Sequence, residues 1–212
     1  MSSLARQLAD VGRRFYARGW VLGTSGNFSA VISRRPLRIA ITPSAAHKGR
    51  LTGRELLVVD DRGVPQVRTD RRKAARPSAE TRLHLEIVRA RGAGAVLHTH
   101  SVWGTMLSDL HADDRGLALE GYEMLKGLDG IGTHEHREWV PILENDQDMT
   151  RLADAVRERL AAEPVAHAFL LRGHGLYTWG ATIDDAERHV EILEFLLEIL
   201  GRRSTHGHRH HP

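Results

Sequence analysis

The chain has 212 residues, of which 41% are hydrophobic and only 5% aromatic, and its formal net charge is +3. This length suits one α/β domain and is short for two, and aliphatic side chains must fill the core. The sequence contains no cysteine, which excludes disulfide bonds, thiolate nucleophiles and cysteine-ligated zinc sites.

The absence of cysteine fits a cytoplasmic protein. No stretch of about 18 apolar residues is present, and the N-terminal segment lacks the apolar core of a signal peptide. One short segment is strongly basic, with Arg68, Arg71, Arg72, Lys73 and Arg76. We interpret it as a surface loop or a basic rim for an anionic substrate; a nucleic-acid footprint is the alternative.

Hydrophobic spacing predicts the elements in chain order. Leu4, Leu8, Val11 and Phe15 recur at helical spacing, which predicts a helix over residues 3–18. Segments 28–32 and 37–41 are predicted to pair as a hairpin, and a short strand follows over residues 56–59. Ser78 is predicted to cap a helix over residues 79–91.

The second half of the chain continues this alternation. The pattern predicts strands over residues 95–98, 139–142, 168–171 and 175–179, and helices over residues 101–110, 148–161 and from 182 or 184 to about 200. Helices at both ends and strands between them indicate an α/β fold with a largely antiparallel or mixed sheet. No glycine-rich nucleotide-binding motif follows a strand. We expect one catalytic domain over residues 1–201 and a disordered His-rich tail over residues 202–212.

Three histidines form the clearest chemical motif. His98 and His100 are two residues apart at the end of a predicted strand, so their side chains point to the same face. His174 lies between two glycines in the turn of a predicted hairpin. Each motif alone also fits a structural histidine, but together the three imidazoles would leave open positions on a zinc-like ion. Such an ion can polarise a carbonyl group and stabilise an enediolate.

An ion of this kind needs an acid/base partner, and two glutamates are candidates. Glu80 follows Ser78 at a predicted helix start, and Glu123 lies in the segment Glu120-Gly-Tyr-Glu-Met-Leu-Lys-Gly. A glutamate that acts as an acid near neutral pH needs a raised pKa, so Glu123 is expected to be partly desolvated. The alternative for either residue is a solvated surface carboxylate.

Small polar residues in turns form a third candidate element. Backbone N–H groups and hydroxyls at turns and helix starts bind phosphate well. The candidates are Gly26, Asn27, Thr42, Ser44, Lys48 and Ser78. For each segment alone, ordinary turn and capping chemistry is the alternative.

These motifs, in this order, resemble the class II aldolase/adducin family. The resemblance rests on residues 24–29, 41–44, 77–81, 98–100 and 172–175 and runs from the first helix to about residue 200. Segments 120–127, 140–148 and 176–180 are most similar to the branch that dehydrates a methylthio-substituted ketose 1-phosphate in methionine salvage.

The resemblance implies a three-layer αβα sandwich, a homotetramer with sites near subunit interfaces, and one zinc ion per subunit on His98, His100 and His174. It implies that Glu123 is the acid/base of the dehydration and that Glu80 takes the position of the catalytic glutamate of sugar-phosphate aldolases. Asn27, Ser44 and Ser78 would hold the phosphate of a small ketose substrate. The implied reaction converts 5-methylthioribulose 1-phosphate to 2,3-diketo-5-methylthiopentyl 1-phosphate.

Two departures from the family pattern bear on the alternatives. Ala45 stands where the family often has glycine, and no tyrosine follows residue 200, where the aldolases carry a proton donor. The nearest alternative is a class II sugar-phosphate aldolase or a pentulose-phosphate 4-epimerase, which the missing tyrosine disfavours. A non-catalytic scaffold domain, as in the adducins, would have no need of three metal ligands.

Overall fold

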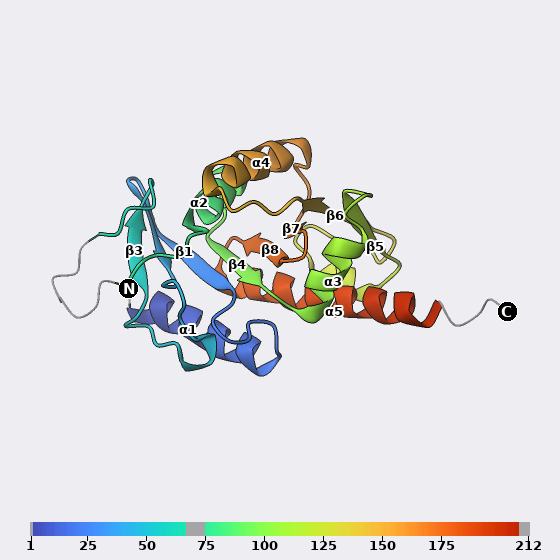
Figure 1. The fold of residues 1–212 in the computed structure, drawn as a ribbon, viewed down its shortest axis with the longest axis horizontal. Coiled ribbons are helices and arrows are strands. Elements are labelled where there is room, and N and C mark those ends of the chain that lie inside the picture. Colours follow the sequence, from blue (N-terminus) through green and yellow to red (C-terminus); the bar gives the residue numbers. More distant parts are fainter. Residues whose placement is uncertain (1, 67–74, 208–212) are drawn as a thin grey trace.

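The computed structural model describes residues 2–66 and 75–207 and arranges them in three layers, with a sheet between helices (Figure 1). The strands are β1 (Asn27–Arg34), β2 (Leu37–Ile41), β3 (Leu57–Asp60), β4 (Ala95–Thr99), β5 (Gly116–Glu120), β6 (Arg137–Leu143), β7 (Ala168–Leu171) and β8 (Gly175–Gly180). The helices are α1 (Ser2–Ala17), α2 (Thr81–Arg91), α3 (Val102–Leu110), α4 (Met149–Ala162) and α5 (Ile183–Gly207), with short 3-10 helices η1 (Lys48–Arg50) and η2 (Glu123–Gly127). The predicted αβα sandwich is confirmed.

The strand order β3-β2-β1-β4-β8-β7-β6-β5 brings the histidine motifs together. Paired strands are antiparallel except β6 and β7, which are parallel. Asn27 of β1 pairs with His98 of β4, and β4 pairs in turn with β8. β7 and β8 form the predicted hairpin, whose turn holds His174. Since β4 and β7 both run antiparallel to β8, their carboxyl ends lie at the same edge of the sheet.

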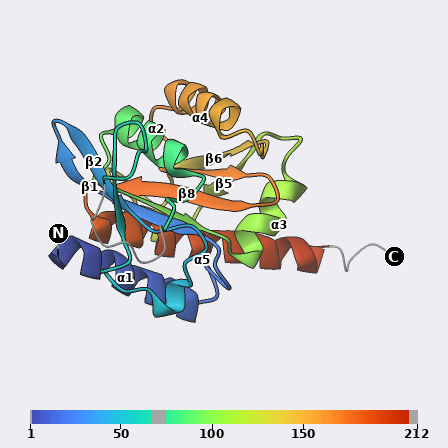
Figure 2. The ribbon, with the colours of Figure 1, turned by 60° about the vertical axis from the view of Figure 1, so that its left-hand side comes forward.

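Helices cover both faces of the sheet. α1 and α5 lie on one face and α2 and α4 on the other (Figure 2). On the first face, Phe15 of α1 packs edge-on against Phe28 of β1. On the second, Leu83 of α2 and Val156 of α4 share a buried cluster with Tyr177 of β8. Because side chains alternate along a strand, Asn27 and His98 point away from α1, toward the start of α2.

The start of α2 differs from the prediction. The helix begins at Thr81 rather than residue 79, and Glu80, not Ser78, is its N-cap residue. Ser78 instead accepts a hydrogen bond from the backbone N–H of Glu80 in the preceding turn, at 3.3 Å. The predicted Ser78 cap is therefore wrong, and the shift places a carboxylate at the helix start.

The sequence pattern also missed structure in the second half of the chain. β5, an edge strand of five residues, and η2 fall in a stretch for which no element was predicted. α5 continues to Gly207, so residues 202–207 are helical and the predicted disordered tail is wrong for them.

Two predictions fall wholly or partly on residues outside the described ranges. Arg68, Arg71, Arg72 and Lys73 of the basic segment lie there, and so do residues 208–212 of the predicted tail. Within the described ranges, no helix combines the length and apolar character that crossing a bilayer requires.

Candidate metal centre and active site

Three imidazole nitrogens converge at the edge of the sheet where β4 and β7 end. The Nε2 atom of His100 lies 2.8 Å from that of His98 and 3.1 Å from that of His174, and the Nε2 atoms of His98 and His174 are 3.3 Å apart. Over residues 2–66 and 75–207, these three residues are the group whose donor atoms are close enough to hold one metal ion. The structure thus brings together all three predicted ligands.

The surroundings of these imidazoles disfavour protons on the triad. Burial, followed by the charges of His100 and His174, lowers the pKa of His98 well below its usual range. Burial, with smaller effects of His174 and Lys48, lowers the pKa of His100 to about 3. Burial also lowers the pKa of His174, although Glu80 opposes it. Neutral imidazoles whose lone pairs face one another suit a shared divalent cation.

The ring of His98 is held so that its Nε2 lone pair faces the other two. Its Nδ1 atom lies 2.9 Å from the carbonyl oxygen of Leu176. Because a carbonyl only accepts, Nδ1 carries the proton and Nε2 of the neutral ring is free to bind metal. The ring also stacks on Tyr177, with centroids 3.9 Å apart and planes at 12°. Both contacts come from β8, so strand pairing itself orients this ligand.

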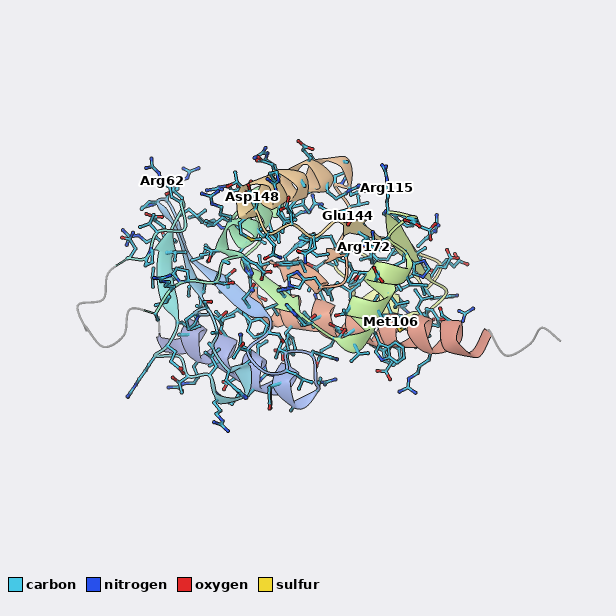
Figure 3. All side chains as sticks on the ribbon, viewed as in Figure 1. Arg62, Met106, Arg115, Glu144, Asp148 and Arg172 are labelled. Atoms are coloured by element: carbon cyan, nitrogen blue, oxygen red, sulfur yellow. The ribbon has the colours of Figure 1, made fainter. Side chains whose placement is uncertain are left out.

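The turn that carries His174 is tied down on both sides. Arg172 donates a hydrogen bond to Glu144 at 3.2 Å (Figure 3). On the other side, a Cβ atom on Gly175 would lie 1.9 Å from the carbonyl oxygen of Thr99, so only glycine allows the turn to approach β4 this closely. The glycine after His174 therefore brings the third ligand to the other two.

Glu80 lies beside the triad. Its Oε1 atom is 3.3 Å from Nε2 of His174, and its Oε2 atom is 3.7 Å from Nε2 of His98. The side-chain nitrogen of Asn27 donates a hydrogen bond to Oε2. A carboxylate at this position can bind the same ion or move a proton at a ligand of that ion.

Lys48 connects two of the predicted phosphate-binding turns. It is buried, and its Nζ atom donates to the carbonyl oxygens of Thr24 at 3.1 Å and Ala46 at 2.8 Å. Burial lowers the pKa of Lys48 to about 8, against the opposing charge of Glu80. The ammonium group therefore supplies positive charge close to the metal centre.

Gly26 and Thr42 support the backbone around the same turns. Gly26 has φ +69°, and a Cβ atom there would lie 2.7 Å from the carbonyl oxygen of His98. The hydroxyl of the buried Thr42 accepts a hydrogen bond from the backbone N–H of Phe28 at 3.1 Å. Both residues shape the site, and their contact with phosphate stays a prediction.

The turns that carry Ser44 and Ser78 lie side by side. Pro43 and Pro77 form an isolated antiparallel bridge that joins the two segments. Ser44 is exposed and Ser78 is half-buried. Ala45 has φ +57°, a left-handed conformation that costs a non-glycine residue about 1–2 kcal/mol. This conformation explains why glycine suits the position, and the two serines stay candidates for phosphate.

Glu123 lies away from the triad of its own chain. Its side chain is 72% exposed, and it pairs with Lys126 at 3.1 Å and His134 at 3.3 Å. It follows β5, which is four strand positions from β4, or roughly 19 Å at about 4.8 Å per strand. β5 also runs antiparallel to β4, so Glu123 follows the opposite edge of the sheet. The expected desolvation of Glu123 is absent in the single chain.

Sequence reasoning missed two buried residues that contact the site. His84 hydrogen-bonds to Asn27, and Glu194 of α5 accepts a hydrogen bond from Thr99, between two of the triad residues. Burial raises the pKa of Glu194 to about 7. His84 could have been found, because it lies one helical turn after Glu80; Glu194 had no local signal, since only folding brings α5 to β4.

Comparisons with known proteins agree with this geometry. The family described as Class II Aldolase and Adducin N-terminal domain matches residues 6–200. The chain is 46% identical over 196 residues to a methylthioribulose-1-phosphate dehydratase of Pseudomonas aeruginosa (strain UCBPP-PA14), covering 92% of both chains. It is 47% identical over 204 residues to the enzyme of that name from Methylococcus capsulatus (strain Bath), covering 96% of this chain and 94% of the relative.

Solved structures share the fold. The Escherichia coli protein YgbL, described as a putative aldolase/epimerase/decarboxylase, aligns with a TM-score of 0.75 at 25% identity, covering 93% of this chain and 88% of that one. An L-fuculose 1-phosphate aldolase aligns with a TM-score of 0.77 at 22% identity, covering 98% of this chain and 89% of that one. At such low identity, the aldolase supports the fold alone.

Proposed function

Because the chain belongs to the class II aldolase and adducin family, we propose that it dehydrates 5-methylthioribulose 1-phosphate to 2,3-diketo-5-methylthiopentyl 1-phosphate in methionine salvage. We propose that it works in the cytoplasm as a homotetramer with one zinc ion per subunit. The observation that carries the proposal is the convergence of three neutral imidazoles beside Glu80. The curated relatives support the choice of a dehydratase over an aldolase or epimerase.

His98, His100 and His174 would hold the ion. When bound, zinc would act as a Lewis acid toward the ketose oxygens. In the reaction, a base removes the C3 proton, the C4 hydroxyl leaves as water after receiving a proton, and the resulting enol tautomerises to the diketone. Glu80, which lies beside two of the three imidazoles, is positioned to hold or move a proton at C3.

The turns around Lys48 would bind the substrate phosphate. Lys48 carries a buried ammonium group, and Ser44 is an exposed hydroxyl beside the segment of Ser78. Hydroxyls and backbone N–H groups supported by a positive charge suit a phosphate dianion. Asn27 suits this role less well, because its amide is already engaged by Glu80 and His84.

Glu123 would deliver the proton to the leaving hydroxyl from a second copy of the chain. Within one chain it lies across the sheet from the triad, so it can reach a metal centre only in another subunit. Apolar surface beside both regions supports such contact. On α3, which follows the triad strand, Val102 is 69% exposed and Leu110 61% exposed, and Met124 next to Glu123 is 39% exposed. Burial in that interface would supply the desolvation that a glutamic acid needs.

Incubation of the purified protein with 5-methylthioribulose 1-phosphate tests the reaction. We expect diketone formation, followed by absorbance, and loss of that activity in Glu80→Gln and Glu123→Gln. Glu120→Gln is the matched control, because Glu120 is an exposed carboxylate at the end of β5 and pairs with Arg137. Release of dihydroxyacetone phosphate from another sugar phosphate would instead indicate aldol cleavage.

Mixing two inactive variants tests whether Glu123 acts across an interface. His100→Ala subunits lack a metal ligand but carry Glu123, and Glu123→Gln subunits keep the triad. If Glu123 acts in a neighbouring subunit, refolding the two together creates sites with an intact triad and an intact glutamate, and activity returns. Activity that stays absent, in mixed oligomers detected by two different affinity tags, would mean that Glu123 acts within its own chain or not at all.

A further inference from the structure

Four polar side chains form a continuous buried hydrogen-bonded chain that ends at Glu80. Ser29 Oγ lies 2.7 Å from His84 Nδ1. His84 Nε2 contacts the side-chain oxygen of Asn27, and the side-chain nitrogen of Asn27 contacts Glu80 Oε2. The chain therefore connects the interior of the domain to the carboxylate beside the metal centre.

Two sequence periodicities create this chain. Asn27 and Ser29 are two residues apart on β1, so their side chains point to the same face of the sheet. Glu80 and His84 are four residues apart, at the N-cap and in the first turns of α2, so they lie on the same side of the helix. Because α2 covers that face of the sheet, the two pairs interleave.

Each hydrogen bond in the chain has only one possible direction. The Glu80 carboxylate accepts, so the amide nitrogen of Asn27 must face it and the amide oxygen must face His84. That oxygen also only accepts, so His84 carries its proton on Nε2. In a neutral ring Nδ1 then accepts, and the Ser29 hydroxyl donates to it. All three donors thus point toward Glu80.

Because the hydrogen-bonded chain is buried, each of its polar groups depends on its partner within that chain. Ser29 and His84 are fully buried, and Asn27 is 5% exposed, so water cannot replace a lost partner. Burial lowers the pKa of His84 to about 3, which keeps the ring neutral. A buried neutral histidine with one donor and one acceptor partner has a fixed tautomer and a fixed ring orientation.

We propose that Ser29 and His84 are positioning residues. They fix the orientation of the Asn27 amide, so that its nitrogen donates a hydrogen bond to Oε2 of Glu80 and Oε1 of Glu80 remains facing His174. The proposal rests on the catalytic use of Glu80 proposed above. A histidine that only fills the core would not need hydrogen bonds of a fixed direction. Its replacement by a ring of similar size would leave the turnover rate unchanged. Locking Asn27 assigns its side chain to Glu80 rather than to substrate phosphate.

Steady-state kinetics of two variants separate positioning from core packing. His84→Gln keeps an N–H donor near the position of Nε2 and so keeps the hydrogen bond to the side-chain oxygen of Asn27, whereas His84→Phe fills the space without a donor. We expect His84→Phe to lower kcat by about 10- to 100-fold, with a much smaller change in KM and unchanged metal content, and His84→Gln to restore most of kcat. Equal turnover in wild type and a folded His84→Phe protein would overturn the proposal.

A second measurement does not depend on the substrate. In protein labelled with ¹⁵N-histidine, long-range ¹H–¹⁵N spectra report the tautomer of His84, assigned by its absence in His84→Gln. We expect a neutral ring protonated on Nε2, and a shift of its nitrogen signals in Ser29→Ala and Asn27→Ala. A ring protonated on Nδ1 would refute the positioning chain even if the protein is an active dehydratase. An inactive wild-type protein with the expected tautomer would refute the proposed reaction but would leave the proposed hydrogen-bonded chain from Ser29 to Glu80 intact.

Discussion

Two clusters of histidines lie at opposite edges of the same sheet, and they differ in what their nitrogens face. In the triad of His98, His100 and His174, three Nε2 atoms face one another. In the second cluster, two imidazoles face the buried carboxylate of Glu138: His136 Nε2 lies 2.8 Å from it and His167 Nδ1 3.0 Å. The first cluster therefore turns three nitrogens toward one another, with Glu80 Oε1 3.3 Å from that of His174, whereas the second surrounds one buried carboxylate with imidazoles.

The geometry of His167 requires a charged ring. Its Nδ1 atom donates to Glu138, and its Nε2 atom lies 2.8 Å from the carbonyl oxygen of Asp129. Both partners only accept, so both ring nitrogens carry protons. Burial alone would lower the pKa of His167, but the hydrogen bond and charge of Glu138 outweigh burial and raise it. Burial likewise opposes ionisation of Glu138, and the hydrogen bonds and charge of His167 lower its pKa.

The partner of an imidazole therefore decides which cation a buried cluster carries. Around Glu138 the cation is a proton on His167, and the cluster is complete without any ligand. In the triad, burial lowers all three pKa values; repulsion from neighbouring imidazoles adds to this at His98 and His100, whereas Glu80 opposes it at His174, so protons on the triad are disfavoured. A metal ion bound there would engage the three imidazole nitrogens instead. Variants in each cluster test whether the triad binds metal while the cluster around Glu138 holds a proton.

Removing one triad ligand should have the largest effect. We expect His100→Ala to lose the bound metal and to lower activity by roughly 10⁴-fold, because a Lewis acid contributes about 5 kcal/mol to such a reaction. The measurement is metal content by mass spectrometry, with protein lacking residues 208–212 so that the His-rich end cannot bind metal. His136→Ala is the control, and it should keep one ion per chain. Equal metal in both variants would contradict the comparison.

Breaking the second cluster should affect stability rather than metal. Glu138→Gln removes the charge that His167 needs and leaves a buried cation without its partner, which costs roughly 3–5 kcal/mol. Urea unfolding at fixed protein concentration measures this loss, and Glu120→Gln, an exposed pair, should cost less than about 1 kcal/mol. If Glu138→Gln released metal without lowering the free energy of unfolding, the two clusters would not be separate.

The sequence predicted the triad better than it predicted the second cluster, for a physical reason. His98 and His100 are two residues apart, a spacing that places both side chains on one face of a strand, and glycines on either side of His174 mark its turn. His136 and Glu138 have the same spacing, but their partner His167 comes from a distant segment with no motif of its own. Only the parallel pairing of β6 with β7 brings the segments together.

Glu123 illustrates a different limit of the sequence. Its segment suggested a catalytic carboxylate near the metal, yet β5 carries it to the far edge of the sheet in its own chain. A local motif can suggest chemistry but does not determine in which subunit that chemistry occurs. The fold layers and most strands, by contrast, follow from the hydrophobic pattern: each helix buries one apolar face, and strands such as β4 and β7, which helices cover on both sides, are short and largely apolar runs.

The pH dependence of stability should carry the signature of the second cluster. His167, with a raised pKa, contributes stability fully below its unfolded value of 6.5, and this contribution is lost as pH rises through the folded pKa. Glu138, with a lowered pKa, contributes above its unfolded value of 4.5 and loses that contribution as pH falls through the folded pKa. The ion pair of His167 and Glu138 therefore contributes its full stability between pH 4.5 and pH 6.5.

Urea unfolding of wild type and Glu138→Gln, from about pH 5 to about pH 9, tests this window. We expect the difference in unfolding free energy to be largest near the acidic end and to shrink as pH rises. The other groups that face the pair are His136, Asp129 and, from α5, His189 and Arg188. A difference that stays constant with pH would mean that His167 is neutral in the folded protein.

The smallest effect should come from His136→Ala, and it decides which ring holds the proton. His136 is partly exposed and gives Glu138 one hydrogen bond, whereas His167 donates from both its backbone N–H and its ring. If His167 carries the charge, losing His136 should cost only about 1 kcal/mol in urea unfolding, because water can reach that side of the carboxylate. A loss as large as that of Glu138→Gln would assign the charge to His136 and leave His167 as a neutral ring, against the geometry of its two acceptors.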